Sequence, residues 1–193
     1  MKSVLHHDYD PNADLTDTSD DIICFLDNIK YTIGNKVLLV GNIGNLGKRL
    51  RMLGVSVTIL DDSCYEDITY SLIQNINCNI VKGSLETLPF KDEYFDKVII
   101  LDYFNHAVDC ERVISEIDRV LNQDGEVILE DLNLKNIKVK LMNIKHKIFG
   151  ENINYHYPSE IIDLFSKVNI TGIMKEIENE RYIYIGKRNT IKD

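Results

Sequence analysis

Residues 88–130 decide the fold of this chain, and they read LPFKDEYFDKVIILDYFNHAVDCERVISEIDRVLNQDGEVILE. The apolar run within residues 97–102 predicts a buried strand, and the helical pattern that ends at Leu121 predicts a helix after it. A turn at Asp124-Gly125 and the apolar run 127–129 predict a second buried strand. Two such strands joined by one crossover helix form a βαβ unit, so the sequence predicts a parallel sheet.

The same alternation of strands and helices continues on both sides of this unit. Upstream, it predicts a helix that Gly34 ends, a strand at 37–40, a glycine-rich turn at 41–47, a short helix whose Leu46, Leu50 and Leu53 share one face, and strands at 55–60 and 79–82. Ser63 and Glu66 have the spacing of a capping box, which predicts a helix between the last two strands. Downstream, it predicts a helix within 134–148, a helix that Pro158 opens, and an antiparallel hairpin formed by 170–177 and 181–185. Periodicity alone therefore predicts a doubly wound α/β sheet.

Length and composition limit the classes of protein to consider. At 193 residues the chain is most economically one domain, for which we expect residues 19–193, preceded by a flexible acidic arm at 1–18. A net charge of −9 disfavours a broad electrostatic grip on nucleic acid. No apolar run approaches the roughly 20 residues of a transmembrane helix, and residues 1–8 lack the apolar core of a signal peptide. Four separated cysteines without a C-x-x-C pair indicate reduced thiols, so we expect a cytoplasmic protein and no metal site.

The central stretch also resembles a known family. Its LPF loop, the Phe95-Asp96 strand start, the His106 that follows the strand and the "EIDRVLNQDG" segment resemble the class I S-adenosylmethionine-dependent methyltransferases, in their small-molecule branch. The resemblance covers roughly residues 36–187. It implies a Rossmann-like, seven-stranded, mostly parallel sheet closed by the C-terminal antiparallel hairpin. It further implies S-adenosylmethionine as the cofactor and a small molecule as the methyl acceptor.

The candidate cofactor-binding residues lie where parallel strands end, because ligands of open α/β sheets bind beyond the carboxyl ends of the strands. A glycine-rich turn allows close approach of the backbone, and an acid about 20 residues later can accept hydrogen bonds from ribose hydroxyls. By resemblance, Asp61 matches the ribose-binding acid of the family, and Ser84 stands where an acid beside the adenine is usual. Asp102 could hold the amino group of the cofactor. The full set of candidates is Gly41, Asn42, Gly44, Asp61, Asp62, Ser84, Leu85 and Asp102.

Departures from the family pattern keep two other functions open. Leu39 replaces a usual acid, Ile43 and Asn45 replace two usual glycines, and Ser84 replaces an acid. A catalytically silent relative with a regulatory or scaffold role is one alternative. The other is an NAD(P)-binding reductase, because the spacing of the glycines resembles that of extended short-chain dehydrogenases, although the Tyr-x-x-x-Lys pair of that family is absent from the sequence.

The candidate catalytic residues follow the strand of the central unit. Methyl transfer needs in-line placement of the acceptor and sometimes a general base. His106 is the candidate base, and Tyr103 and Asn105 are candidate orienting groups. Two alternatives are that Asn105-His106 only caps the following helix, and that His106 lies against the adenosine.

One basic segment stands out in this acidic chain. Residues 134–149 carry five lysines and no acid, on a helical pattern of apolar residues, and they lie within a possible lid insertion at 132–157. Three interpretations compete: a helix docked beside the sheet, a lid whose cations attract an anionic acceptor, and a surface helix that touches acidic membrane.

Overall fold

The computed structural model describes residues 26, 29–62, 78–177 and 180–189. The chain divides into two compact units, residues 1–30 and residues 31–193, and the architecture below is that of the second unit. The predicted acidic arm, most of the first helix, and the capping box of Ser63 and Glu66 lie outside the described residues. The boundary proposed at residue 18 therefore stays a prediction.

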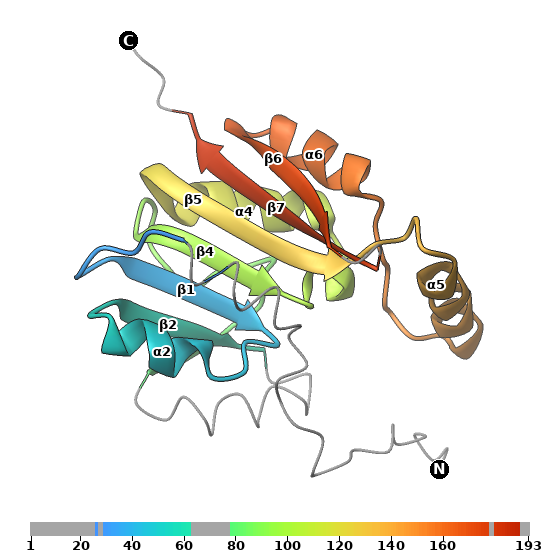
Figure 1. Ribbon diagram of the computed structural model, residues 1–193, viewed down its shortest axis with the longest axis horizontal. Coiled ribbons are helices and arrows are strands. Elements are labelled where there is room, and N and C mark those ends of the chain that lie inside the picture. The colour runs from blue at the N-terminus through green and yellow to red at the C-terminus, as the bar shows by residue number, and fades with distance from the viewer. Residues whose placement is uncertain (1–25, 27–28, 63–77, 178–179, 190–193) are drawn as a thin grey trace. The chain divides into compact units, whose positions relative to one another are not determined.

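The second unit is built on a seven-stranded sheet with the order β3-β2-β1-β4-β5-β7-β6 (Figure 1). The first five strands are parallel to one another, and β7 is antiparallel to both β5 and β6. This arrangement confirms the predicted sheet and its closing hairpin. The elements are β1 (Lys36–Gly41), α2 (Leu46–Met52), β2 (Ser56–Asp61), β3 (Asn79–Lys82), β4 (Phe95–Leu101), η1 (Phe104–His106), α4 (Cys110–Val120), β5 (Leu121–Leu132), α5 (Ile137–Phe149), α6 (Pro158–Ser166), β6 (Ile170–Ile177) and β7 (Arg181–Arg188).

The core lies between one face of the sheet and helices α4 and α6, which Figure 1 shows behind the strands. α4 buries an apolar stripe that repeats at helical spacing, and Asp109 caps its first turn by accepting a hydrogen bond from the Arg112 backbone N–H at 3.0 Å. Pro158 occupies the first turn of α6, as predicted. The Phe165 ring of α6 stacks on Tyr184 of β7 with 4.6 Å between ring centroids, which ties the helix to the sheet.

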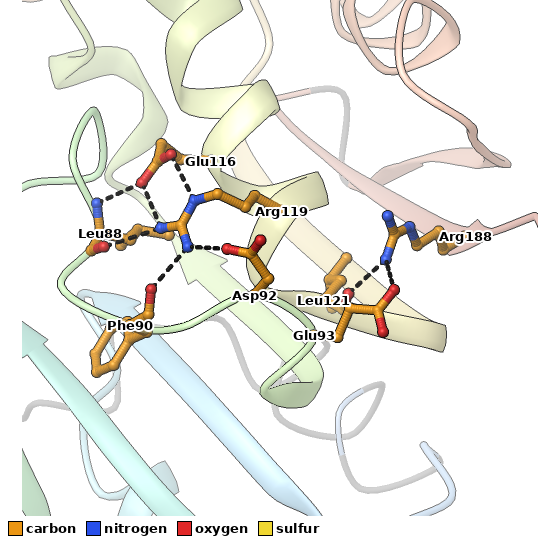
Figure 2. A network of polar contacts seen from close by, with 8 residues as sticks. All are labelled: Leu88, Phe90, Asp92, Glu93, Glu116, Arg119, Leu121 and Arg188. Carbon is orange, nitrogen blue, oxygen red and sulfur yellow. Dashed lines mark hydrogen bonds and ion pairs between the residues drawn. The ribbon is translucent and has the colours of Figure 1, made fainter.

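The LPF loop is fixed to α4 by one arginine (Figure 2). Arg119 donates hydrogen bonds to the carbonyl oxygens of Leu88 (3.0 Å) and Phe90 (2.7 Å) and forms ion pairs with Glu116 and Asp92 at 2.8 Å. The Glu116 carboxylate also accepts the Leu88 backbone N–H at 2.8 Å. The hydrogen bonds from Arg119 and Leu88 hold the pKa of Glu116 below its usual value, although partial burial opposes them. A planar guanidinium with several donors suits this task, because it can satisfy two loop carbonyls and two carboxylates together.

Three local predictions need correction. Leu53 does not join Leu46 and Leu50 in the core but is exposed, because α2 ends at Met52. Asp124-Gly125 does not separate helix and strand, because β5 begins at Leu121 and these residues lie where its register with β4 shifts. In the docked-helix interpretation of residues 134–149 the apolar row does not form the contact, since Ile137, Leu141, Ile144 and Ile148 are exposed.

Candidate functional site

The ends of β1 and β4 approach each other closely at Gly41. Gly41 lies opposite Leu101 in the parallel register and has φ +89°, a left-handed conformation that favours glycine. A Cβ at this position would stand 2.2 Å from the Leu101 carbonyl oxygen and 2.5 Å from Cβ of Tyr103. Gly41 is therefore required by the meeting of two strand ends, in addition to any contact with a ligand.

The turn after Gly41 keeps part of its surface available for a ligand. The Asn42 backbone N–H donates to the Leu101 carbonyl at 2.8 Å, while its side chain is exposed. Gly44 is half-buried and has φ +47°. Ile43, at a position where the family usually has glycine, is buried, so the extra side chain points away from solvent. The turn thus combines the exposed amide side chains of Asn42 and Asn45 with a glycine backbone, which fits close approach of a nucleoside.

Asp61 stands at the same edge of the sheet as Gly41. β1 and β2 pair with Leu39 opposite Ile59, so Gly41 and Asp61 each follow two residues later along parallel strands. Asp61 is half-exposed and lies opposite Lys82 of β3. Asp62 is half-exposed as well. The structure therefore brings the predicted ribose acid beside the glycine turn, where its carboxylate can meet a ligand.

The loop after β3 supplies the next part of the edge. Leu85 is buried, and the Ser84 hydroxyl lies 3.2 Å from the Glu86 carboxylate. The other oxygen of Glu86 accepts the backbone N–H groups of Val108 (2.8 Å) and Asp109 (3.2 Å). Glu86 therefore holds the loop of Ser84 and Leu85 against the segment that follows β4. The sequence contains no signal for this role, because the contact joins residues more than 20 positions apart.

A group of acidic residues lies directly after β4 and near the end of β5. Asp102 is a non-glycine residue with φ +48°, its backbone N–H donates to the Glu130 carbonyl at 3.0 Å, and its carboxylate lies 3.5 Å from Arg181. Arg181 also forms an ion pair with the buried Glu130. Burial raises the pKa of Glu130 to about 7, although Arg181 opposes that shift.

Asp131 is the second buried carboxylate of this group. It accepts hydrogen bonds from the backbone N–H groups of Asn105 (2.9 Å) and Leu132 (2.7 Å) and from Nδ2 of Asn105 (3.1 Å). Burial raises the pKa of Asp131 well above its usual value, with a further contribution from the Asp102 and Glu130 charges. Sequence reasoning missed both Glu130 and Asp131, although two acids at the end of an apolar strand are a signal for this edge.

The three candidate catalytic residues lie together after β4. The rings of Tyr103 and His106 have centroids 5.2 Å apart, and the His106 backbone N–H donates to the Tyr103 carbonyl at 3.1 Å. Asn105 is buried against Asp131, and His106 is half-buried. The alternative in which Asn105-His106 caps the next helix is wrong, because Asp109 caps α4.

Comparison with known proteins identifies the class to which this fold and edge belong. Residues 42–129 match the family model of a methyltransferase domain. The antiparallel β7 between β5 and β6 also differs from the dinucleotide-binding strand order 3-2-1-4-5-6, which disfavours the reductase alternative. Residues 42–129 are therefore similar to a methyltransferase domain, and the seven-stranded sheet is the fold that the resemblance to class I, S-adenosylmethionine-dependent methyltransferases implied.

The chain is also similar to particular proteins. It is 42% identical over 143 residues to a glycine/sarcosine/dimethylglycine N-methyltransferase of Actinopolyspora halophila, covering 58% of this chain and 25% of that protein. A Thermotoga maritima structure described as a possible histamine N-methyltransferase has a TM-score of 0.68 and 17% identity, covering 88% of each chain. The [4+2]-cyclase SpnF has a TM-score of 0.71 and 11% identity, covering 97% of this chain and 88% of that one. The chain spans 25% to 49% of the length of the first curated relatives that it matches.

Proposed function

We propose that this protein transfers a methyl group from S-adenosylmethionine to a small-molecule acceptor. The observation that carries the proposal is the position of the Gly41 turn, Asp61 and Asp102 at one edge of the methyltransferase fold. When bound, S-adenosylmethionine supplies an electrophilic methyl group on a sulfonium. The chain then has to bind both molecules, align them and exclude water.

The cofactor would be held by residues on four segments. Asp61 would accept hydrogen bonds from the ribose hydroxyls, with Asp62 beside it. Asn42 and Gly44 would line the approach to the turn, and Ser84 with the buried Leu85 would lie beside the adenine. Asp102 would pair with the ammonium group of the methionine moiety, because its carboxylate is half-exposed at the end of β4.

We further propose that the acceptor atom is an amine nitrogen. The carboxyl groups of Asp102, Glu130 and Asp131 surround Arg181 with hydrogen-bond acceptors, which suits a ligand that carries N–H groups better than an anionic one. The names of the Actinopolyspora halophila and Thermotoga maritima proteins point to amine acceptors as well. His106, beside Tyr103, is the group proposed to take the proton that the nitrogen must lose.

This proposal differs from the lid interpretation of the basic segment, in which the acceptor is anionic. Lys135 and Lys138 of that segment form ion pairs with Glu176 and Glu180, so part of its charge is already balanced.

The free thiols of Cys78 and Cys110 support a reducing, cytoplasmic location.

A methyl-transfer assay tests the proposed acceptor class. Labelled S-adenosylmethionine is incubated with the full chain and with glycine, sarcosine, histamine or matched carboxylic acids and alcohols. We expect label to pass to one or more amines, and we expect His106→Ala to reduce that transfer by 10²–10⁴-fold, the range for a lost general base. Transfer to an acid or alcohol but to no amine would contradict the amine proposal.

A second candidate is a relative that binds the cofactor without transferring its methyl group. The departures from the family pattern at Leu39, Ile43, Asn45 and Ser84 motivate it, and the fold is shared with a protein named as a cyclase. Cofactor binding without transfer to any acceptor would support this candidate.

A further inference from the structure

Helix α5 is attached to the rest of the fold by one face. Val139 and Asn143 are its buried residues, and Oδ1 of Asn143 accepts the Tyr155 backbone N–H at 3.4 Å. His146, on the same side, lies 6.0 Å from Tyr155 between ring centroids and forms an ion pair with Glu151. The face of α5 that contacts the rest of the fold is therefore the one that carries Val139, Asn143 and His146, and its polar side chains contact the segment that follows the helix.

The opposite face of α5 is an exposed apolar row. Ile137, Leu141, Ile144 and Ile148 follow one another at intervals of four, three and four residues, so they share one side of the helix. Their exposed fractions are 69%, 61%, 55% and 75%. Figure 1 shows α5 beyond the end of β5, apart from the seven strands. A continuous row of large exposed aliphatic side chains indicates an interaction surface.

Lysines border this apolar row on both sides. At about 100° per residue, Lys138 and Lys145 fall on one flank of the row, and Lys140 and Lys147 fall on the other; of these four, Lys138 also forms an ion pair with Glu180 at 2.7 Å. The helix contains no acidic residue. Lysines at the borders of an apolar stripe can place their stems along the apolar phase and their ammonium groups at its polar boundary.

We propose that α5 is a docking helix for an anionic lipid surface, on which it lies in the plane of the interface. An apolar row between two flanks of lysine matches the chemistry of a bilayer with acidic headgroups, where acyl chains lie below a layer of negative charge. A second copy of α5 fits less well, because facing helices would bring Lys140, Lys145 and Lys147 of each copy close to lysines of like charge. The chain as a whole carries −9, so the attraction is local and orients the molecule with α5 toward the lipid.

The helix is suited to lie on a membrane and not to cross one. Its 13 residues span only about 20 Å, shorter than the hydrocarbon core. Among the residues that the structure describes, no helix is long and apolar enough to cross a membrane. The segment that follows α5 contacts the candidate site, since the Asn154 backbone N–H donates to the Asn105 carbonyl at 2.7 Å.

Vesicle flotation with the full chain tests this proposal. The probes are vesicles of phosphatidylcholine alone and vesicles in which part of it is replaced by phosphatidylserine, each at low and high salt. We expect the wild type to bind the anionic vesicles, and we expect high salt to weaken this binding. The double variant Leu141→Gln with Ile148→Gln should bind at least tenfold more weakly. Lys145→Gln with Lys147→Gln should weaken binding to anionic vesicles by a similar factor, because one lysine is lost from each flank.

Matched controls separate α5 from general effects of lost charge or apolar surface. Ile173→Gln removes an exposed isoleucine from β6, and Lys91→Gln with Lys187→Gln removes two exposed lysines outside α5. These variants should bind as the wild type does, and circular dichroism should show all variants folded. Absent binding to anionic vesicles, or equal binding by the α5 variants and the wild type, would overturn the proposal. Sedimentation velocity provides a second contradicting outcome. If the wild type binds no vesicles but forms a dimer, and Leu141→Gln with Ile148→Gln dissociates that dimer, the proposal is overturned.

Discussion

At the scale of single residues, the structure requires glycine at position 41 for two separate reasons. Its φ of +89° is costly for any other residue, and its missing Cβ leaves room for the Leu101 carbonyl and Tyr103. Gly34 has a similar φ of +86° but nothing within 4 Å of an added Cβ. The two glycines therefore separate the cost of a left-handed conformation from the cost of a steric clash.

We predict that Gly41→Ala is far more destabilising than Gly34→Ala. Gly34→Ala should lower the free energy of unfolding by about 1–2 kcal/mol, the cost of a left-handed residue with a Cβ. Gly41→Ala adds a clash with backbone and should cost more than about 4 kcal/mol or prevent folding. Urea denaturation followed by circular dichroism measures both values, and equal losses would show that the strand ends do not meet as described.

Glu130 gives stability a pH dependence. Its pKa is raised from 4.5 to about 7 in the folded protein, so between these values the native state binds more protons than the unfolded state. Stability therefore falls as pH rises through this window, by roughly 1–3 kcal/mol from this residue.

We predict that Glu130→Gln flattens this part of the stability curve. The wild type should lose stability between about pH 4.5 and pH 7, while the variant should lose less, because the glutamine does not ionise. Asp131 contributes a slope of the same sign to both proteins, and this slope is smaller in the variant because the Glu130 charge that helps to raise the Asp131 pKa is gone; the difference between the curves therefore reports Glu130 together with its effect on Asp131. Melting temperatures across this range measure the effect, and parallel curves would contradict the described burial of Glu130.

At the scale of elements, Arg119 determines how the LPF loop sits on α4. We predict that Arg119→Ala lowers the free energy of unfolding by about 1.5–3 kcal/mol, because two loop carbonyls and the Glu116 carboxylate lose a charged donor. Arg119→Lys should restore less than half of the loss, because one ammonium cannot reproduce the fork. Lys91→Ala, an exposed position in the same loop, is the control. Full rescue by lysine in urea denaturation would show that only the charge matters.

Elements also show where sequence patterns are sufficient. The buried strands of the sheet are continuous apolar runs, so periodicity and length identify them. α5 shows the limit, because its spacing reveals an apolar row but cannot tell whether that row faces the sheet or solvent. Its inner face is instead set by Val139 and Asn143, two residues that no periodicity singles out.

At the scale of the whole molecule, the candidate site is assembled from strand ends that are far apart in the sequence. Gly41, Asp61 and Asp102 could be predicted, because ligands of such sheets bind beyond the carboxyl ends of parallel strands. Arg181 could not, since it enters the site only through the antiparallel pairing of β7 with β5. The acidic character of the acceptor side therefore emerges from the assembled sheet.

The central claim is that this edge of the sheet binds S-adenosylmethionine, and isothermal titration calorimetry tests it most directly. We predict that the full chain binds S-adenosylmethionine and S-adenosylhomocysteine at one site and does not bind NAD or NADP. Asp61→Ala should weaken that binding by about 1.5–3 kcal/mol, the range for hydrogen bonds to a charged group, while Asp124→Ala should not change it. Absence of binding to both S-adenosyl compounds, or an unchanged affinity in Asp61→Ala, would contradict the account.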